Sequence, residues 1–84
     1  MLAFVLVVNV VYAQAPVRNV SPRLHPNLAE AQELCFQAYQ KIEAAQKANN
    51  GDMGGHALRA KELLEQVNSE LKLAAEAANV NRGK

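Results

Sequence analysis

The chain is poor in the residues that build large cores and β-sheets. Among its 84 residues there is no tryptophan and no threonine, and there are only two tyrosines and two phenylalanines. Alanine is the commonest apolar residue after the N-terminal segment, and alanine favours helices while burying little area. Few β-branched residues remain from which to form a sheet. The composition therefore predicts one small all-α domain.

The chain also lacks any concentration of charge of one sign. Its formal net charge is +1, and acidic and basic residues alternate through the second half. Nucleic acid binding requires a basic patch, so we expect no nucleic acid partner. Paired carboxylates, nucleophile–base pairs and glycine-rich nucleotide motifs are missing as well, so we expect a protein that is not an enzyme.

The only long apolar run stands at the N-terminus, over residues 2–12. It is about half as long as a membrane-spanning helix. The small residues Ala13 and Ala15 follow it, which favours a secretory signal peptide over a buried core strand or helix. We predict a signal peptide over residues 1–13, cleaved after Ala13 or after Ala15. Cleavage after Ala13 is preferred, because the alternative leaves Pro16 first, and proline restricts the backbone at a cleavage site.

This interpretation carries two consequences. No lysine or arginine precedes the apolar run, so either the true start lies upstream or the amino terminus alone supplies the positive charge. The processed protein is expected to be periplasmic or secreted, with no stable membrane insertion once the signal peptide is removed.

Residues 14–26, here called the leader, contain all three prolines and show no apolar periodicity. We predict that the leader is extended or disordered. A first helix is predicted over about 28–49, with Asn27 as its N-cap, Glu30 completing a capping box and Gly51 as a left-handed C-cap. Its apolar residues recur every three or four positions, which marks one helix face: Leu28, Ala31, Cys35, Ala38, Ile42 and Ala45.

A second helix is predicted over about 53–79, with Asp52 able to cap it and with 80–84 as a short tail. Its apolar face has the same spacing: Ala57, Ala60, Leu64, Val67, Leu71, Ala74 and Ala78. Because the connection is short, the two helices should be antiparallel neighbours. Large residues of one face then meet small residues of the other. The predicted fold is an all-α, two-helix antiparallel hairpin over residues 27–79.

Large apolar residues remain beside or outside this predicted helix–helix contact: Leu34, Phe36, Tyr39, Leu58, Leu63 and Leu73. They are many for so short a chain. We therefore predict self-association, most simply a homodimer that forms a four-helix bundle, or contact with an unknown protein partner. The alternative is a monomer with a few solvated leucines.

The candidates for chemistry are the cysteine, the two histidines and the residues beside His56. Cys35, the only cysteine, is expected to be a small buried apolar residue facing Val67, although a lone exposed cysteine bridging two chains stays open. A weak metal site is conceivable where Asp52, Met53 and His56 share the start of the second helix. His25, the other histidine, lies at the opposite end of the hairpin and is not expected to contribute.

The segment Gly55-His56-Ala57-x-x-Ala60-Lys61-Glu62-Leu63-Leu64, ahead of an alanine-rich helix, resembles the small periplasmic metal-binding proteins. The resemblance covers the second helix and its turn. It implies a helical bundle that binds copper or a similar divalent ion. Two functions are therefore open: an exported, non-catalytic hairpin that associates with itself or a partner and needs no cofactor, or a small periplasmic metal binder.

Overall fold

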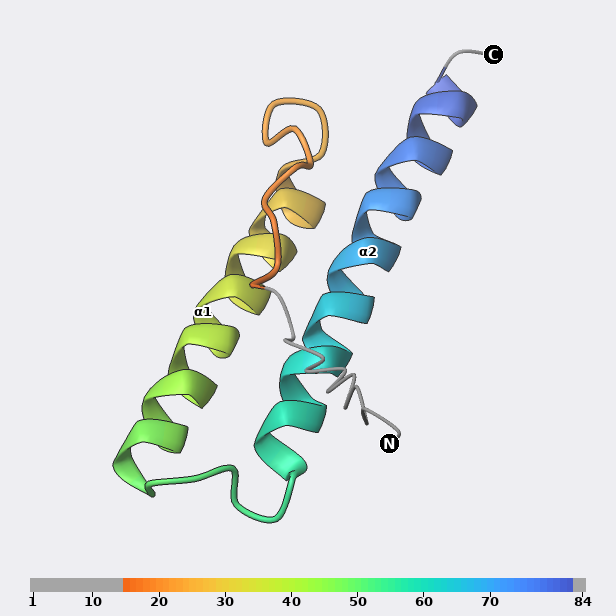
Figure 1. The fold of residues 1–84 in the computed structure, drawn as a ribbon. Coiled ribbons are helices and arrows are strands. Elements are labelled where there is room, and N and C mark those ends of the chain that lie inside the picture. The colour runs from red at the N-terminus through yellow and green to blue at the C-terminus, as the bar shows by residue number, and fades with distance from the viewer. Residues whose placement is uncertain (1–14, 83–84) are drawn as a thin grey trace, which may run out of the picture.

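A computed structural model describes residues 15–82 of the protein, which form two long helices. Helix α1 spans Pro26–Ala48 and helix α2 spans His56–Arg82. They lie side by side and run in opposite directions (Figure 1). Residues 15–82 contain no strand, so the prediction of an all-α, two-helix antiparallel hairpin is confirmed. The predicted signal peptide, residues 1–13, lies outside the described residues.

Helix α1 begins at Pro26, two residues before the predicted start. Its N-cap is His25 and no side chain caps it, so the prediction of an Asn27 cap is wrong. Proline is favoured at the first helical position, where its missing N–H needs no partner. A turn leads directly into the helix, because the His25 N–H donates to the Ser21 carbonyl at 2.8 Å.

The left-handed residue that follows α1 is Asn50, not Gly51. The prediction that Gly51 is the left-handed C-cap is therefore also wrong. Asn50 has a φ of 52°. The Gly51 N–H donates to the Gln46 carbonyl at 3.1 Å and the Asn50 N–H to the Lys47 carbonyl at 3.3 Å. This is the Schellman pattern that satisfies the last carbonyls of a helix. Asparagine adopts this conformation more readily than other residues with side chains.

Asp52 caps helix α2, as predicted. Its Oδ1 accepts a hydrogen bond from the Leu58 N–H at 2.8 Å. The helix itself starts at His56 and not at 53, because Met53, Gly54 and Gly55 have φ values of 51°, 76° and 86°. Residues of a right-handed helix have negative φ values, so these three residues cannot belong to α2. At the other end α2 continues to Arg82, three residues beyond the predicted end.

The buried residues of the two helices are here called the seam. Most of them lie one position further along the chain than the residues that were predicted to be buried. The seam residues are Gln32, Cys35 and Tyr39 on α1, and Ala57, Lys61, Asn68 and Ala75 on α2. Burial of Cys35 and Ala57 agrees with the prediction. Tyr39 was expected outside the contact and is buried, whereas Val67 and Ala74 were expected inside and are exposed. Val67 therefore lies outside the seam that buries Cys35.

The contacts of the leader explain why each helix buries a different row of residues from the predicted one. Residues 15–19 have no regular secondary structure, and the described leader lies against the helices with Pro16 and Val20 buried (Figure 1). A segment without helix or sheet carries backbone N–H and C=O groups that must find other partners when they are buried. Polar seam residues supply those partners, so the helices turn polar side chains toward the leader.

Candidate functional site

Gln32 holds the leader against helix α1. Its side chain is fully buried, and its Oε1 accepts hydrogen bonds from the N–H groups of Asn19 and Val20, both at 2.9 Å. Its Nε2 donates to Asn19 Oδ1 at 2.9 Å. One side chain thus satisfies two consecutive backbone donors of the leader and one leader side chain. A buried amide is stable only when it is satisfied in this way.

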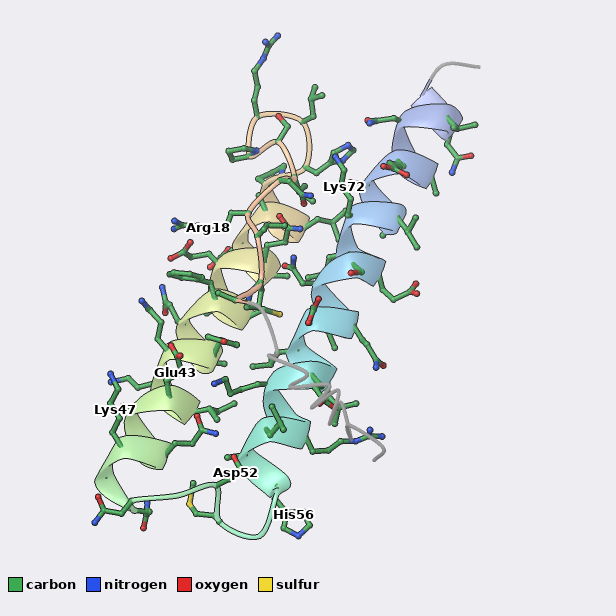
Figure 2. The ribbon with its side chains drawn as sticks, viewed as in Figure 1. Arg18, Glu43, Lys47, Asp52, His56 and Lys72 are labelled. Carbon is green, nitrogen blue, oxygen red and sulfur yellow. The ribbon has the colours of Figure 1, made fainter. Side chains whose placement is uncertain are left out.

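Helix α2 holds the other edge of the leader. Asn68 Nδ2 donates to the Val17 carbonyl at 2.8 Å, and Lys72 Nζ donates to the Asn19 carbonyl at 3.1 Å. Asn68 is buried, and its Oδ1 accepts no hydrogen bond within residues 15–82. Lys72 projects from α2 on the side of the molecule where the leader lies (Figure 2). The leader is therefore bonded to both helices and covers one side of the hairpin.

An exposed ion pair adds to the contact with α1. Arg18 Nη1 donates to Glu33 Oε2 at 2.8 Å, and its guanidinium group lies 4.6 Å from the centre of the Phe36 ring. Hydrogen bonds from Arg18 and then Gln37 lower the pKa of Glu33 below its ordinary value of 4.5. Exposed pairs of this kind contribute little stability, so Arg18 mainly orients the leader.

Near the inter-helix turn the seam contains a buried lysine. Lys61 Nζ donates to Gln46 Oε1 at 3.1 Å and lies 3.7 Å from Glu43 Oε2. It also lies 4.7 Å from the centre of the Tyr39 ring. A buried ammonium group needs such partners. The Lys61 contacts fix how α1 and α2 are rotated against each other at this end.

On the side opposite the leader, α2 presents mainly apolar residues, with the exposed Glu70 at the outer edge. With about 100° between successive residues of a helix, the leader-binding residues Asn68 and Lys72 mark the side of α2 that faces the leader. The opposite flank, between residues 57 and 80, contains Ala60, Leu63, Leu64, Val67, Leu71, Ala74 and Ala78. Leu63, Val67 and Ala74 are exposed and the other four are half-buried.

Helix α1 continues this surface. The same construction places Ala31, Leu34, Ala38, Ile42 and Ala45 on its matching flank; Leu34 is exposed, and Ile42 and the alanines are half-buried. Lys41 and Glu30 stand at its outer edge. The α1 and α2 residues on the side without the leader are here called the open face. It includes most of the residues that the apolar periodicity assigned to the contact between the helices.

The predicted metal ligands Asp52, Met53 and His56 lie at or beside the inter-helix turn. Asp52 Oδ1 is used by the Leu58 N–H and by Gln46 Nε2. Met53 and His56 are exposed, and the His56 ring points outward from the turn (Figure 2). Within residues 15–82 no three His, Cys, Asp or Glu side chains are grouped closely enough to hold a metal ion. Metal binding by Asp52, Met53 and His56 stays a prediction.

The two remaining candidates lie in or beside the seam. Cys35 is a free, buried thiol, and burial raises its pKa above the ordinary value of 9.0. It is therefore protonated and shielded at neutral pH, unlike a reactive cysteine. His25 is buried at the far end of the hairpin, with its Nε2 2.7 Å from Asn79 Oδ1. It joins the start of α1 to the end of α2.

Gln32, Lys61 and Asn68 are buried, although the apolar pattern did not predict their burial. The signal was present, because these three follow the same three-and-four spacing as the apolar rows. Gln32 is in register with Cys35 and Tyr39, and Lys61 and Asn68 are in register with Ala57 and Ala75. Each helix thus carries two neighbouring rows with equal periodicity, and hydrophobicity alone selects the wrong one.

Comparison with protein-family models, with curated proteins and with solved structures finds no match to this chain. Over residues 15–82, neither helix combines the length and the apolar character that a membrane crossing requires.

Proposed function

We propose that this protein is an exported, non-catalytic hairpin that acts by binding a protein chain through its open face. The carrying observation is the mainly apolar flank of α2, continued by alanines, Leu34 and Ile42 of α1. Soluble proteins rarely leave contiguous apolar patches larger than a few hundred Å² exposed, and larger patches mark interaction sites. The role in export rests on the N-terminal pattern of residues 1–13.

The division of the hairpin into two sides supports the proposal. The leader covers one side and uses Gln32 and Asn68, while the other side is left to the apolar rows. A hairpin that needed its apolar residues for its own core would bury them between the helices. Here Gln32, Lys61 and Asn68 share that position with Cys35, Tyr39 and two alanines, and most of the predicted apolar rows are left for a partner.

Site-specific photo-crosslinking in cells that express the full chain tests the proposal. A photoreactive amino acid at position 67 should give covalent adducts with a protein, because Val67 is 48% exposed at the centre of the open face. The matched control is position 73, since Leu73 is 53% exposed on the same helix but on the leader side. Absence of adducts at 67, or equal adducts at both positions, contradicts the proposal.

Export is tested separately. The mass of the protein recovered outside the cytoplasm should correspond to a chain that begins at Gln14 or at Pro16. Recovery of the uncleaved chain from the cytoplasm alone would contradict this part of the proposal and leave the crosslinking result to stand by itself.

A further inference from the structure

We propose that the open face is covered by a second copy of this chain, related by a two-fold axis parallel to the helices. Helix α1 of each copy then lies on helix α2 of the other, and both inter-helix turns lie at the same end of a four-helix bundle. This inference rests on the proposed function and names the partner that the open face binds.

The two helices contribute unequal bulk to the open face, which is the first argument. Helix α1 offers Ala31, Ala38 and Ala45 beside Leu34 and Ile42, whereas α2 offers Leu63, Leu64, Val67 and Leu71 beside three alanines. Because α2 carries more of the bulk, a two-fold axis that sets α1 of one copy on α2 of the other brings the bulkier helix against the smaller one. Alternating large and small residues lets facing helices approach closely.

The positions of residues along the hairpin axis support the same pairing of α1 with the partner's α2. His25 lies level with Asn79, since their side chains are 2.7 Å apart, and Glu43 lies level with Lys61 at 3.7 Å. Ala38 is therefore level with Val67 to within about one residue. In the proposed dimer, Ala38 of one copy faces Val67 of the other, and Ala31 faces Leu71 to Ala74.

The size of the open face is the second argument. Helix α1 has 23 residues, so the overlap of the two helices is about 35 Å long at 1.5 Å per residue, and two adjacent helices are about 20 Å wide. The face thus offers about 700 Å² per copy, close to the ~800 Å² per partner of a stable protein interface. Among described residues, the charged groups Glu30 and Lys41 stand at its edge, as in interfaces with polar rims.

The alternative two-fold arrangement stacks α1 on α1 and α2 on α2. It would set Ala38 against Ala38 near the middle of α1, where the two small side chains would leave a gap. Leucines would meanwhile face leucines on α2. Gaps and overpacking both cost stability in close-packed interiors, so we favour α1 on the partner's α2.

Sedimentation equilibrium on protein processed from the full chain gives the first test. The wild-type protein should be a dimer at micromolar concentration, and Val67→Glu should raise the dissociation constant by at least about 100-fold, because it buries an unpaired carboxylate in the interface. Leu73→Glu is the matched control and should leave the dimer intact. Circular dichroism should show equal helix content in all three proteins.

Each outcome is informative. Ala74→Glu, also on the open face, replaces Val67→Glu if the latter loses its helical signal. A wild-type monomer at 100 micromolar (about 0.1 mM, where even weak dimers form) overturns the second copy as partner. If position 67 then still crosslinks to a different protein, the proposed function stands and only this inference fails. If it crosslinks to nothing, both fail.

Disulfide trapping tests the arrangement. On a Cys35→Ala background, Ala38→Cys protein mixed with Val67→Cys protein should form the mixed disulfide when the two are oxidised together. Neither protein alone should crosslink comparably. A strong disulfide between two Ala38→Cys chains would instead indicate α1 on α1 and overturn the proposed geometry.

Discussion

Gln32 carries no exposed surface, yet it is polar, and the reason lies in the backbone of the leader. Two leader N–H groups point at its Oε1. Without that oxygen they would be buried and unsatisfied, which costs about 1–3 kcal/mol for each group. A single amide at this position is therefore worth more to the fold than an apolar side chain of similar size.

Replacing Gln32 by methionine should lower the free energy of unfolding by about 2–4 kcal/mol, because the shape is kept and both acceptor bonds are lost. Urea unfolding followed by circular dichroism measures the change. Gln37→Met is the matched control, since Gln37 is exposed on the same helix, and it should change stability by less than about 0.5 kcal/mol. Similar values for the two variants would contradict the role of Gln32.

The Glu33 carboxylate gives a prediction about pH. Its hydrogen bonds from Arg18 and Gln37 lower its pKa in the folded protein. Because the unfolded value is higher, the Arg18–Glu33 contact contributes above pH 4.5 and is lost as the pH falls through the lower folded pKa. An NMR titration should place Glu33 below 4.5, and Arg18→Gln should move it upward. An unchanged titration in the variant would show that Arg18 is not the cause.

Among the elements, the connection between the helices depends on conformation more than on composition. Residues 53–55 all have positive φ, whereas Gly51 does not, although it looked like the natural helix cap. Asn50 takes that role and lets Gly51 donate to Gln46. Sequence preferences identified the position of the turn correctly but assigned its left-handed residue one place too late.

Alanine substitutions should distinguish the conformational roles of Gly54 and Gly51. Gly54→Ala should cost about 1–2 kcal/mol of stability, because alanine is strained at a φ of 76°. Gly51→Ala should be near neutral, since an added Cβ at that position has nothing within 4 Å and φ is not positive. Thermal unfolding of both variants measures the difference. A larger loss for Gly51→Ala would reverse this account of the turn.

The two helix faces show what the spacing of apolar residues cannot predict, namely which row is buried. The spacing of apolar residues correctly predicted two helices and their antiparallel order. It could not decide between the row of Ala60, Val67 and Ala74 and the adjacent row of Lys61, Asn68 and Ala75, because both have helical spacing. The partners of Lys61 and Asn68 lie 15 and 51 residues away along the chain, and local pattern does not contain them.

For the whole molecule, the leader is a third structural element. Val20→Ala should lower stability by about 1.5 kcal/mol, since it removes two buried methyl groups, which corresponds to a fall in melting temperature of about 6–12 °C. The matched control is Val17→Ala, because Val17 is exposed in the same segment, and it should have little effect. Equal melting temperatures for the two variants would mean that the leader contributes nothing to the fold.

The sequence by itself determined the helical class, the turn near residue 51 and the surplus of apolar surface, because these follow from local propensity, spacing and composition. Only the tertiary structure decided which row of each helix is buried. The leader must satisfy its backbone, so Gln32 and Asn68 turn inward to meet it. The alanine and leucine rows are thereby left on the opposite side, where the open face forms.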